Sequence, residues 1–266
     1  MSMISTQQPL VYAAATDVGL VRGHNEDALL SCPELGLWAV ADGMGGHRRG
    51  EVASALALQA LRAACAGGAE LSAAVHAANA AVLAAAEADA ECRDMGTTLV
   101  AVRCRGADFQ IAWVGDSRAY RVDADAIARL SHDHSWVQAM VDAGQMSESE
   151  ARCHPQRGVI FQCLGREDQD LEIGLVQGRL RPHELLLLCS DGLSGELEDG
   201  RIQQLCAVAT TLDELVANLV AEANRQGGND NISCIVLGRA PTASDEPPAT
   251  GRPRGRFSRL FKPLIP

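Results

Sequence analysis

The order of the expected strands and helices constrains the fold of this chain more than any other feature of its sequence. Alternating or continuous apolar residues predict strands between positions 10 and 42, and apolar residues at helical spacing predict two helices between 51 and 90. Strand patterns return over 97–123, and a helix over 211–228 precedes a last strand over 231–239. These elements do not alternate as they would around a parallel sheet, so two sheets covered by helices fit the order better.

Two other segments define the expected domain organisation. Residues 131–165 have a helical but irregular pattern, and from about Pro241 the chain is rich in Pro, Gly and small polar residues. We expect a folded domain over 1–240 and a flexible basic tail over 241–266. Apolar residues at helix-like spacing among the arginines of the tail leave two interpretations, a disordered end or a short docking element for an acidic partner or a membrane surface.

Composition narrows the class of protein. The chain has 266 residues and a formal net charge of −11, which argues against nucleic acid as a partner of the folded domain. No apolar run is long enough to span a bilayer, and the first residues lack the pattern of a secretory signal. Nine cysteines are scattered without a Cys-x-x-Cys pair, which favours reduced core thiols over disulfides or a structural zinc site. We therefore expect a cytoplasmic protein without stable membrane anchoring.

Residues 39–51 read AVADGMGGHRRGE, a run of small apolar residues that leads into Asp42 and a glycine-rich turn. One interpretation is a tight turn, for which Asp-Gly is a common sequence. The other is a site for a hard cation or a phosphate, where bare backbone has to approach a ligand beside a carboxylate. This stretch alone leaves both interpretations open.

The same pattern, an acid at the end of an expected strand, recurs at Asp116, Asp191 and Asp230 and at the neighbours Glu26 and Asp27. Acids at the tips of strands that share a core can converge on one rim, where they would repel one another unless cations lay between them. Oxygen ligands of this kind select magnesium or manganese over zinc. For the set as a whole, the sequence favours a metal site.

Six short motifs carry a resemblance to a known family. They are TDVGLVRGHNEDA, AVADGMGGHRRGE, MGTTLVAV, VGDSRAY, CSDGL and NDNIS, in this order. Together they resemble the signature of metal-dependent serine/threonine protein phosphatases of the type 2C class, in their compact bacterial form. The resemblance covers residues 10–238 and implies an α+β fold, a four-layer α-β-β-α sandwich of two antiparallel sheets flanked by helices. It also implies two bound Mn²⁺ or Mg²⁺ ions, with a third, weaker ion in bacterial members.

The resemblance assigns metal ligands to the glycine-rich stretch and to two of the later motifs. Asp42 would bridge the two cations, and the carbonyl of Gly43 would bind one of them. The glycines would let backbone and metal-bound water approach where a Cβ would intrude. Asp191 and Asp230 would complete the ligand shell of one metal.

The resemblance also assigns supporting residues and a phosphate ligand. Glu26 would hold the other metal largely through water, with Asp27 orienting the ligands from behind, and Asp116 would share the third ion with Asp191. Arg22 would receive the phosphate, because its planar guanidinium matches phosphate oxygens in a bidentate way. The implied mechanism is attack of a metal-activated water on phosphorus, while the cations and the arginine offset charge on the phosphoryl oxygens.

Some positions depart from the family pattern. Met44 stands where some members have a histidine that could protonate the leaving group, and His47 is a nearby alternative of a kind that is more often structural. Gly158 and Gln162 replace polar and basic residues of the expected flap, so the substrate preference of relatives does not transfer. The histidines of SHDHSW at 131–136 are expected to belong to a helix cap rather than to a metal site.

The sequence thus predicts a cytoplasmic bacterial phosphatase that removes phosphate from serine and threonine in proteins and opposes a serine/threonine kinase. It would act as a monomer on phosphorylated proteins and would not bind nucleic acid. The alternative is a catalytically silent phosphatase-like binding or regulatory module that has kept the fold and lost turnover. The acids needed for turnover are all present, and this favours the enzyme; they are Glu26, Asp42, Asp191 and Asp230.

Overall fold

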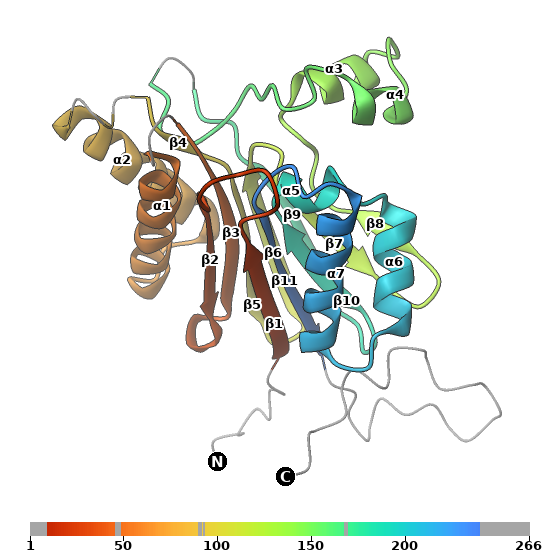
Figure 1. Cartoon of the computed structure of the whole chain (residues 1–266). Helices are drawn as coiled ribbons and strands as arrows, with labels where there is room; N and C mark the ends of the chain where they lie inside the picture. Colours follow the sequence, from red (N-terminus) through yellow and green to blue (C-terminus); the bar gives the residue numbers. More distant parts are fainter. Residues whose placement is uncertain (1–9, 46–48, 90–91, 93, 168–169, 240–266) are drawn as a thin grey trace, which may run out of the picture.

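The structure is a computed structural model that describes residues 10–45, 49–89, 92, 94–167 and 170–239. Figure 1 shows two sheets stacked face to face, with a pair of helices on each outer side. A smaller helical segment projects at one end of this sandwich. The predicted four-layer α+β architecture with two antiparallel sheets is therefore confirmed.

The first sheet has five antiparallel strands in the order β1-β11-β10-β7-β8. They are β1 (Leu10–Asp17), β11 (Ile232–Arg239), β10 (Leu185–Cys189), β7 (Arg118–Val122) and β8 (Ile127–Arg129). The run LLLLC of β10 does not alternate with polar residues because both faces of this central strand are buried. Leu185 and Leu187 contribute to the core beneath the helices, and Leu186 and Leu188 contribute to the core between the sheets.

The second sheet is antiparallel in the order β2-β3-β5-β6-β9, with a short β4 paired to β3. Its strands are β2 (Asp27–Cys32), β3 (Leu37–Met44), β4 (Gly96–Thr97), β5 (Leu99–Arg105), β6 (Asp108–Val114) and β9 (Gly174–Arg179). The 3-10 helix η1 (Pro33–Leu35) joins β2 to β3. Side chains alternate along β3, so Leu37 and Ala39 contact the helices while Trp38 and Val40 contact the first sheet.

Two helix pairs complete the sandwich. Helices α1 (Arg49–Ala66) and α2 (Leu71–Ala88) cover the second sheet, and α6 (Asp199–Val208) and α7 (Leu212–Gln226) cover the first (Figure 1). Small buried residues such as Ala53 and Ala57 on α1 and Ala74 and Ala78 on α2 allow the first pair to pack closely. Each sheet therefore has a core under its own helices in addition to the core that the sheets share.

Helix α2 is unusually apolar for its length. Of the helices in the described part of the chain, it alone is long and apolar enough to cross a bilayer by length and composition. Core helices of globular proteins meet the same criterion. In this fold, the buried residues of α2 pack with α1 and the second sheet in a common core.

Residues 131–165, which we call the flap, contain α3 (Trp136–Asp142) and α4 (Glu148–Cys153) and project beyond the sheets (Figure 1). Ser135 caps α3 by accepting the N–H of Gln138 at 3.3 Å, so the predicted helix cap is confirmed. Ser147 and Glu150 form a capping box at the start of α4. Directly after β10 the chain forms the one-turn helix α5 (Asp191–Ser194). The predicted tail at 241–266 lies outside the described residues.

Candidate metal centre

The predicted site residues meet at one end of the sandwich. All of them except Asp27 line one pocket of about 340 Å³. The predicted residues that line it are Arg22, Glu26, Asp42, Gly43, Asp116, Asp191 and Asp230. Because these residues lie far apart in the sequence, the tertiary fold brings them together.

Antiparallel pairing explains why the acids share one end of the sheets. Asp42 lies near the end of β3 and pairs with Asp27 at the start of β2. Asp191 follows β10, and Asp230 precedes β11, which is the neighbour of β10. Asp116 lies in the connection between β6 of the second sheet and β7 of the first. Since neighbouring antiparallel strands end and begin at the same edge, acids from both sheets reach one pocket.

Burial and the neighbouring carboxylates raise the pKa values of three acids of the pocket. For Asp42 and Asp116, burial is the main cause and the neighbouring carboxylates add to it, so both pKa values lie well above the ordinary range. The pKa of Asp191 is also raised, mainly by burial, although a hydrogen bond with Asp42 and the charge of Arg22 oppose part of the rise. Positive charge between these acids would relieve both the repulsion and the desolvation.

Asp27 lies behind the pocket. Its Oδ2 accepts a hydrogen bond from Ser190 Oγ at 2.8 Å, and Ser190 directly precedes Asp191. Burial raises the pKa of Asp27 to about 7, although hydrogen bonds from Ser233 and Ser190 lower it. The position agrees with the predicted place behind the metal ligands, and the role of Asp27 in orienting them stays a prediction.

Asp191 gives the clearest indication that the pocket suits a cation. Its Oδ1 is buried and has no hydrogen-bond partner among the described residues. Leaving a buried carboxylate oxygen unpaired costs free energy, and a divalent cation would supply the missing partner. An all-oxygen donor set suits Mg²⁺ or Mn²⁺. No three acid, histidine or cysteine side chains in the described part of the chain are gathered closely enough to chelate an ion as they stand, so the carboxylates would have to turn toward it.

Arg22 contacts one of the acids. Its Nη2 donates a hydrogen bond to Asp230 Oδ2 at 2.6 Å, and this bond raises the pKa of the guanidinium. The side chains of Arg22 and Asp230 are 54% and 35% exposed, so a solute in the pocket can reach both. The position fits the predicted role of Arg22 as a phosphate ligand, in which the phosphate would replace Asp230 as its partner.

Two glycines of AVADGMGGHRRGE, Gly43 and Gly50, meet a packing requirement. A Cβ on Gly43 would lie 2.1 Å from the carbonyl oxygen of Gly50 and 2.5 Å from that of Glu26. A Cβ on Gly50 would lie 2.7 Å from Glu26 Oε2. Side chains at either position would force β3, the start of α1 and Glu26 apart. The stretch is therefore more than a tight turn, because it brings bare backbone up to an acid of the pocket.

Asn231 binds the backbone of the loop that carries Arg22 and Glu26. It is not among the predicted site residues. Its Oδ1 accepts the N–H of Glu26 at 2.8 Å, and its Nδ2 donates to the carbonyls of Val18 and His24 at 2.9 and 3.0 Å. His24 also lines the pocket, with its Nε2 3.0 Å from Glu26 Oε1. Membership of the motif NDNIS was the available signal for Asn231, but its partners are set by the tertiary fold.

The flap supplies part of the pocket wall. Gly158 and Ile160 line the pocket together with Met44. Gln162, which replaces a basic residue of the family pattern, is not among the pocket residues that the structure describes, and its Oε1 accepts the N–H of Glu172 at 3.2 Å. The departures of the flap from the family pattern therefore reach the pocket at Gly158 and not at Gln162.

Neither His132 of the flap nor any cysteine is among the described residues that line the acid pocket. His132 of SHDHSW pairs with Asp142 at 2.7 Å on the flap, and His47 lies outside the described residues. All nine cysteines are free thiols and most are buried, which confirms the predicted core thiols. Burial raises the pKa of Cys104 and that of Cys206 to about 12. None of the nine is among the described residues that line the pocket.

Comparison with known proteins shows which family this chain resembles, independently of the geometry of the pocket. The model of a family described as protein phosphatase 2C matches residues 22–235. The serine/threonine protein phosphatase PstP of Mycobacterium tuberculosis is 38% identical over 233 residues, which cover 85% of this chain and 44% of that protein. The serine/threonine phosphatase stp of Listeria innocua is 33% identical over 237 residues, which cover 84% of this chain and 94% of that protein. The chain thus spans less than half of PstP and nearly all of the Listeria protein.

Solved structures agree with the family match. The crystal structure of the Mycobacterium tuberculosis phosphatase PstP/Ppp is similar to this chain with a TM-score of 0.80 at 37% identity, over 86% of this chain and 98% of that one. A structure described as the catalytic domain of the serine/threonine protein phosphatase PstP in complex with two manganese ions gives a TM-score of 0.76 at 34% identity, over 86% and 97% of the two chains.

Proposed function

Since this chain belongs to the protein phosphatase 2C family, we propose that it hydrolyses phosphoserine and phosphothreonine in proteins with the help of divalent cations. One observation carries the proposal. Acids from both sheets and Arg22 line the same pocket, and Asp191 has a buried oxygen without a partner among the described residues. The acids offer oxygen ligands to cations, and the guanidinium offers a bidentate donor to the phosphate.

We assign the cation ligands by position. Asp42, Asp191 and Asp230 would bind directly with their carboxylates, and Gly43 would bind through its carbonyl. Glu26 would act through water, Asp27 would support the ligands from behind, and Asp116 would share a third ion with Asp191. Bound Mn²⁺ or Mg²⁺ would supply an activated water and positive charge beside the phosphoryl oxygens.

Residues of the chain would orient the substrate. The guanidinium of Arg22 can donate two parallel hydrogen bonds to phosphate oxygens, which aligns phosphorus and offsets the charge that develops as the bond to the leaving oxygen breaks. Gly158 and Ile160 border the pocket on the flap side, so the protein part of the substrate would pass along the flap.

Phosphate release from synthetic peptides tests the proposal. The Mn²⁺-loaded chain should release phosphate from phosphoserine and phosphothreonine peptides and should lose this activity in EDTA. Release of phosphate from a phosphotyrosine peptide, and not from the other two, would show that the proposed substrate class is wrong. The silent binding module is the second candidate, and a chain that binds manganese and a phosphopeptide without releasing phosphate would establish it instead.

The wider role is part of the same proposal. We infer that the chain is a cytoplasmic monomer that opposes a bacterial serine/threonine kinase, with a catalytic domain over 1–240 and a basic tail over 241–266. The nine free thiols fit a reducing compartment. Comparing the phosphoproteins of a deletion strain with those of its parent would identify the substrates.

A further inference from the structure

The two helices of the flap bury few residues. None of the six residues of α4 is buried, and α3 buries only Val137 and Gln138. Between the flap and the body lies a cavity of about 730 Å³, lined mostly by polar and charged residues. An apolar core therefore does not fix the position of α4, so individual polar contacts must do so.

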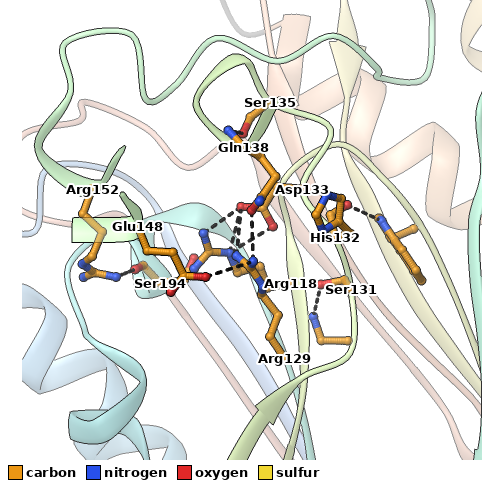
Figure 2. Close-up of polar contacts among 12 residues, drawn as sticks. Arg118, Arg129, Ser131, His132, Asp133, Ser135, Gln138, Glu148, Arg152 and Ser194 are labelled. Carbon is orange, nitrogen blue, oxygen red and sulfur yellow. Dashed lines mark hydrogen bonds and ion pairs between the residues drawn. The ribbon is translucent and has the colours of Figure 1, made fainter. Parts of the chain in front are cut away.

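The stem of the flap is anchored by a buried ion pair. Asp133 is 8% exposed, and its carboxylate accepts hydrogen bonds from Arg118 Nε at 3.0 Å and from Arg118 Nη2 at 2.7 Å (Figure 2). The backbone of His134 adds a bond to the carbonyl of Gly115 at 3.0 Å. These contacts tie the stem to the segment that carries Asp116, so the stem is the rigid end of the flap.

The far end of the flap is held by Arg152. Its Nη1 donates to the carbonyl oxygen of Ser194 at 3.1 Å, and its Nη2 donates to that of Gly195 at 3.3 Å. Figure 2 shows Arg152 reaching from the flap to Ser194. Glu148, one helical turn before Arg152 on the same face of α4, lies 3.9 Å from Arg129 of the body. Both contacts of α4 therefore come from one face, and Arg152 makes the shorter ones.

Arg152 links the flap to both sides of the pocket. Its partners lie at the end of α5, the one-turn helix that begins with Asp191. Six and eight residues after Arg152, the chain reaches Gly158 and Ile160 in the pocket wall. Bonds from Trp136 to Val159 and from Phe161 to His134 attach this segment to the stem as well. The wall is thus fixed at the stem on one side and through α4 on the other.

We propose that Arg152 is a positioning residue for protein substrates, because it fixes α4 on α5 and thereby sets the flap wall of the pocket. This inference rests on the proposed phosphatase function. A peptide on either side of the phosphorylated residue would lie along that wall, whereas p-nitrophenyl phosphate fills only the pocket itself. Loss of Arg152 should therefore weaken recognition of peptides far more than turnover of the small substrate.

The test compares Arg152→Ala and Arg152→Lys with the wild-type full chain loaded with Mn²⁺. For a phosphothreonine peptide, Arg152→Ala should raise KM about five- to tenfold, the effect of losing hydrogen bonds from a charged donor. Its kcat for p-nitrophenyl phosphate should stay within about twofold of wild type. Lysine can reach one carbonyl but cannot span two, so the peptide KM of Arg152→Lys should lie between those of wild type and Arg152→Ala. Arg179→Ala, which removes an exposed arginine paired with Asp108 away from the flap, is the matched control.

Amide hydrogen exchange supplies a readout that does not depend on activity. Peptides covering 148–161 should exchange faster in Arg152→Ala than in wild type and in Arg179→Ala. Unchanged exchange together with an unchanged peptide KM would overturn the proposal. So would an equal loss of turnover for the peptide and for p-nitrophenyl phosphate. If the wild type hydrolysed neither substrate, the proposed function would fail, while the exchange result would still decide whether Arg152 holds the flap. If Arg152→Ala did not fold, the same comparison with Arg152→Lys would decide.

Discussion

In the acid pocket, the carboxylates stand at the ends of strands or in the turns beside them, whereas polar side chains of the flap and the body line a cavity of about 730 Å³ between them. Asp42 and Asp191 are backed by β3 and β10, whose apolar residues are buried on both faces. Helix α4 buries nothing. On the proposed function, chemistry that requires fixed distances would lie on the sheets, and the surface that would meet a protein substrate would lie on a segment held by polar contacts.

The largest expected effect concerns the pocket. Asp42→Asn keeps the shape of the side chain but removes its charge, so the cations would lose the ligand between them. We expect hydrolysis of p-nitrophenyl phosphate to fall by about 10³-fold or more, since one change removes both nucleophile activation and charge stabilisation. Asp108→Asn, at an exposed strand end, is the control and should behave as wild type. Near-normal turnover by Asp42→Asn would show that the acids of this pocket do not hold the cations that hydrolysis requires.

The next effect concerns the stem of the flap. Asp133→Asn would leave the guanidinium of Arg118 without its charged partner in a largely buried position. We expect the free energy of unfolding, measured in urea, to fall by about 3 kcal/mol, as for other broken buried pairs. Asp142→Asn, in the same flap, breaks an exposed pair with His132 and should cost less than about 1 kcal/mol. Equal costs for the two variants would show that the stem is no more rigid than the rest of the flap.

The third effect concerns Arg22 in the acid pocket. Arg22→Ala should raise KM for a phosphopeptide and also lower kcat, each by about tenfold, because the phosphate oxygens gain charge as the bond breaks. Arg22→Lys should restore only part of the loss, since an ammonium cannot make the parallel pair of bonds. Steady-state kinetics with wild-type values for Arg22→Lys would argue against bidentate recognition.

The smallest effect concerns the tail. Deleting residues 241–266 should leave the melting temperature nearly unchanged. It should change the turnover of p-nitrophenyl phosphate by no more than about 10%, as expected when a terminal segment lies outside the folded unit. The last strand, β11, ends at Arg239 and pairs with β1 and β10. A large loss of folded protein on this deletion would place the tail in the core and move the domain boundary.

Much of the fold could be predicted because its apolar patterns are strong. The strands between positions 10 and 42 and the helices α1, α2 and α7 agree with the patterns that predict them. No pattern in the sequence singles out β8, β9 or α6. Strand β9 has only partly buried and exposed residues, and α6 begins with mostly polar residues and buries only Ile202, Leu205 and Cys206, so neither gives a clear local signal. Their places are set by neighbouring elements.

The site divides in the same way. Its acids could be predicted because they stand in short motifs at strand ends, and the pocket contains all of them except Asp27, which lies behind. Asn231 and Ser190 could not, because a hydrogen bond across 205 or 163 residues leaves no trace in the local sequence. The same holds for Arg152, whose partners are backbone carbonyls of Ser194 and Gly195 and therefore impose no side-chain pattern.

The central claim is that the convergent acids bind cations, and a calorimetric titration of the metal-free chain with Mn²⁺ at pH 6.5 tests it most directly. We expect about two ions per chain, with protons released on binding, because burial and neighbouring carboxylates raise the pKa of Asp42 and raise that of Asp27 to about 7, while a cation favours the charged carboxylates. Comparing buffers with different ionisation enthalpies measures that release. Asp42→Asn should lose most of the heat. A wild-type chain that binds no manganese, or that remains fully active in EDTA, would contradict the account.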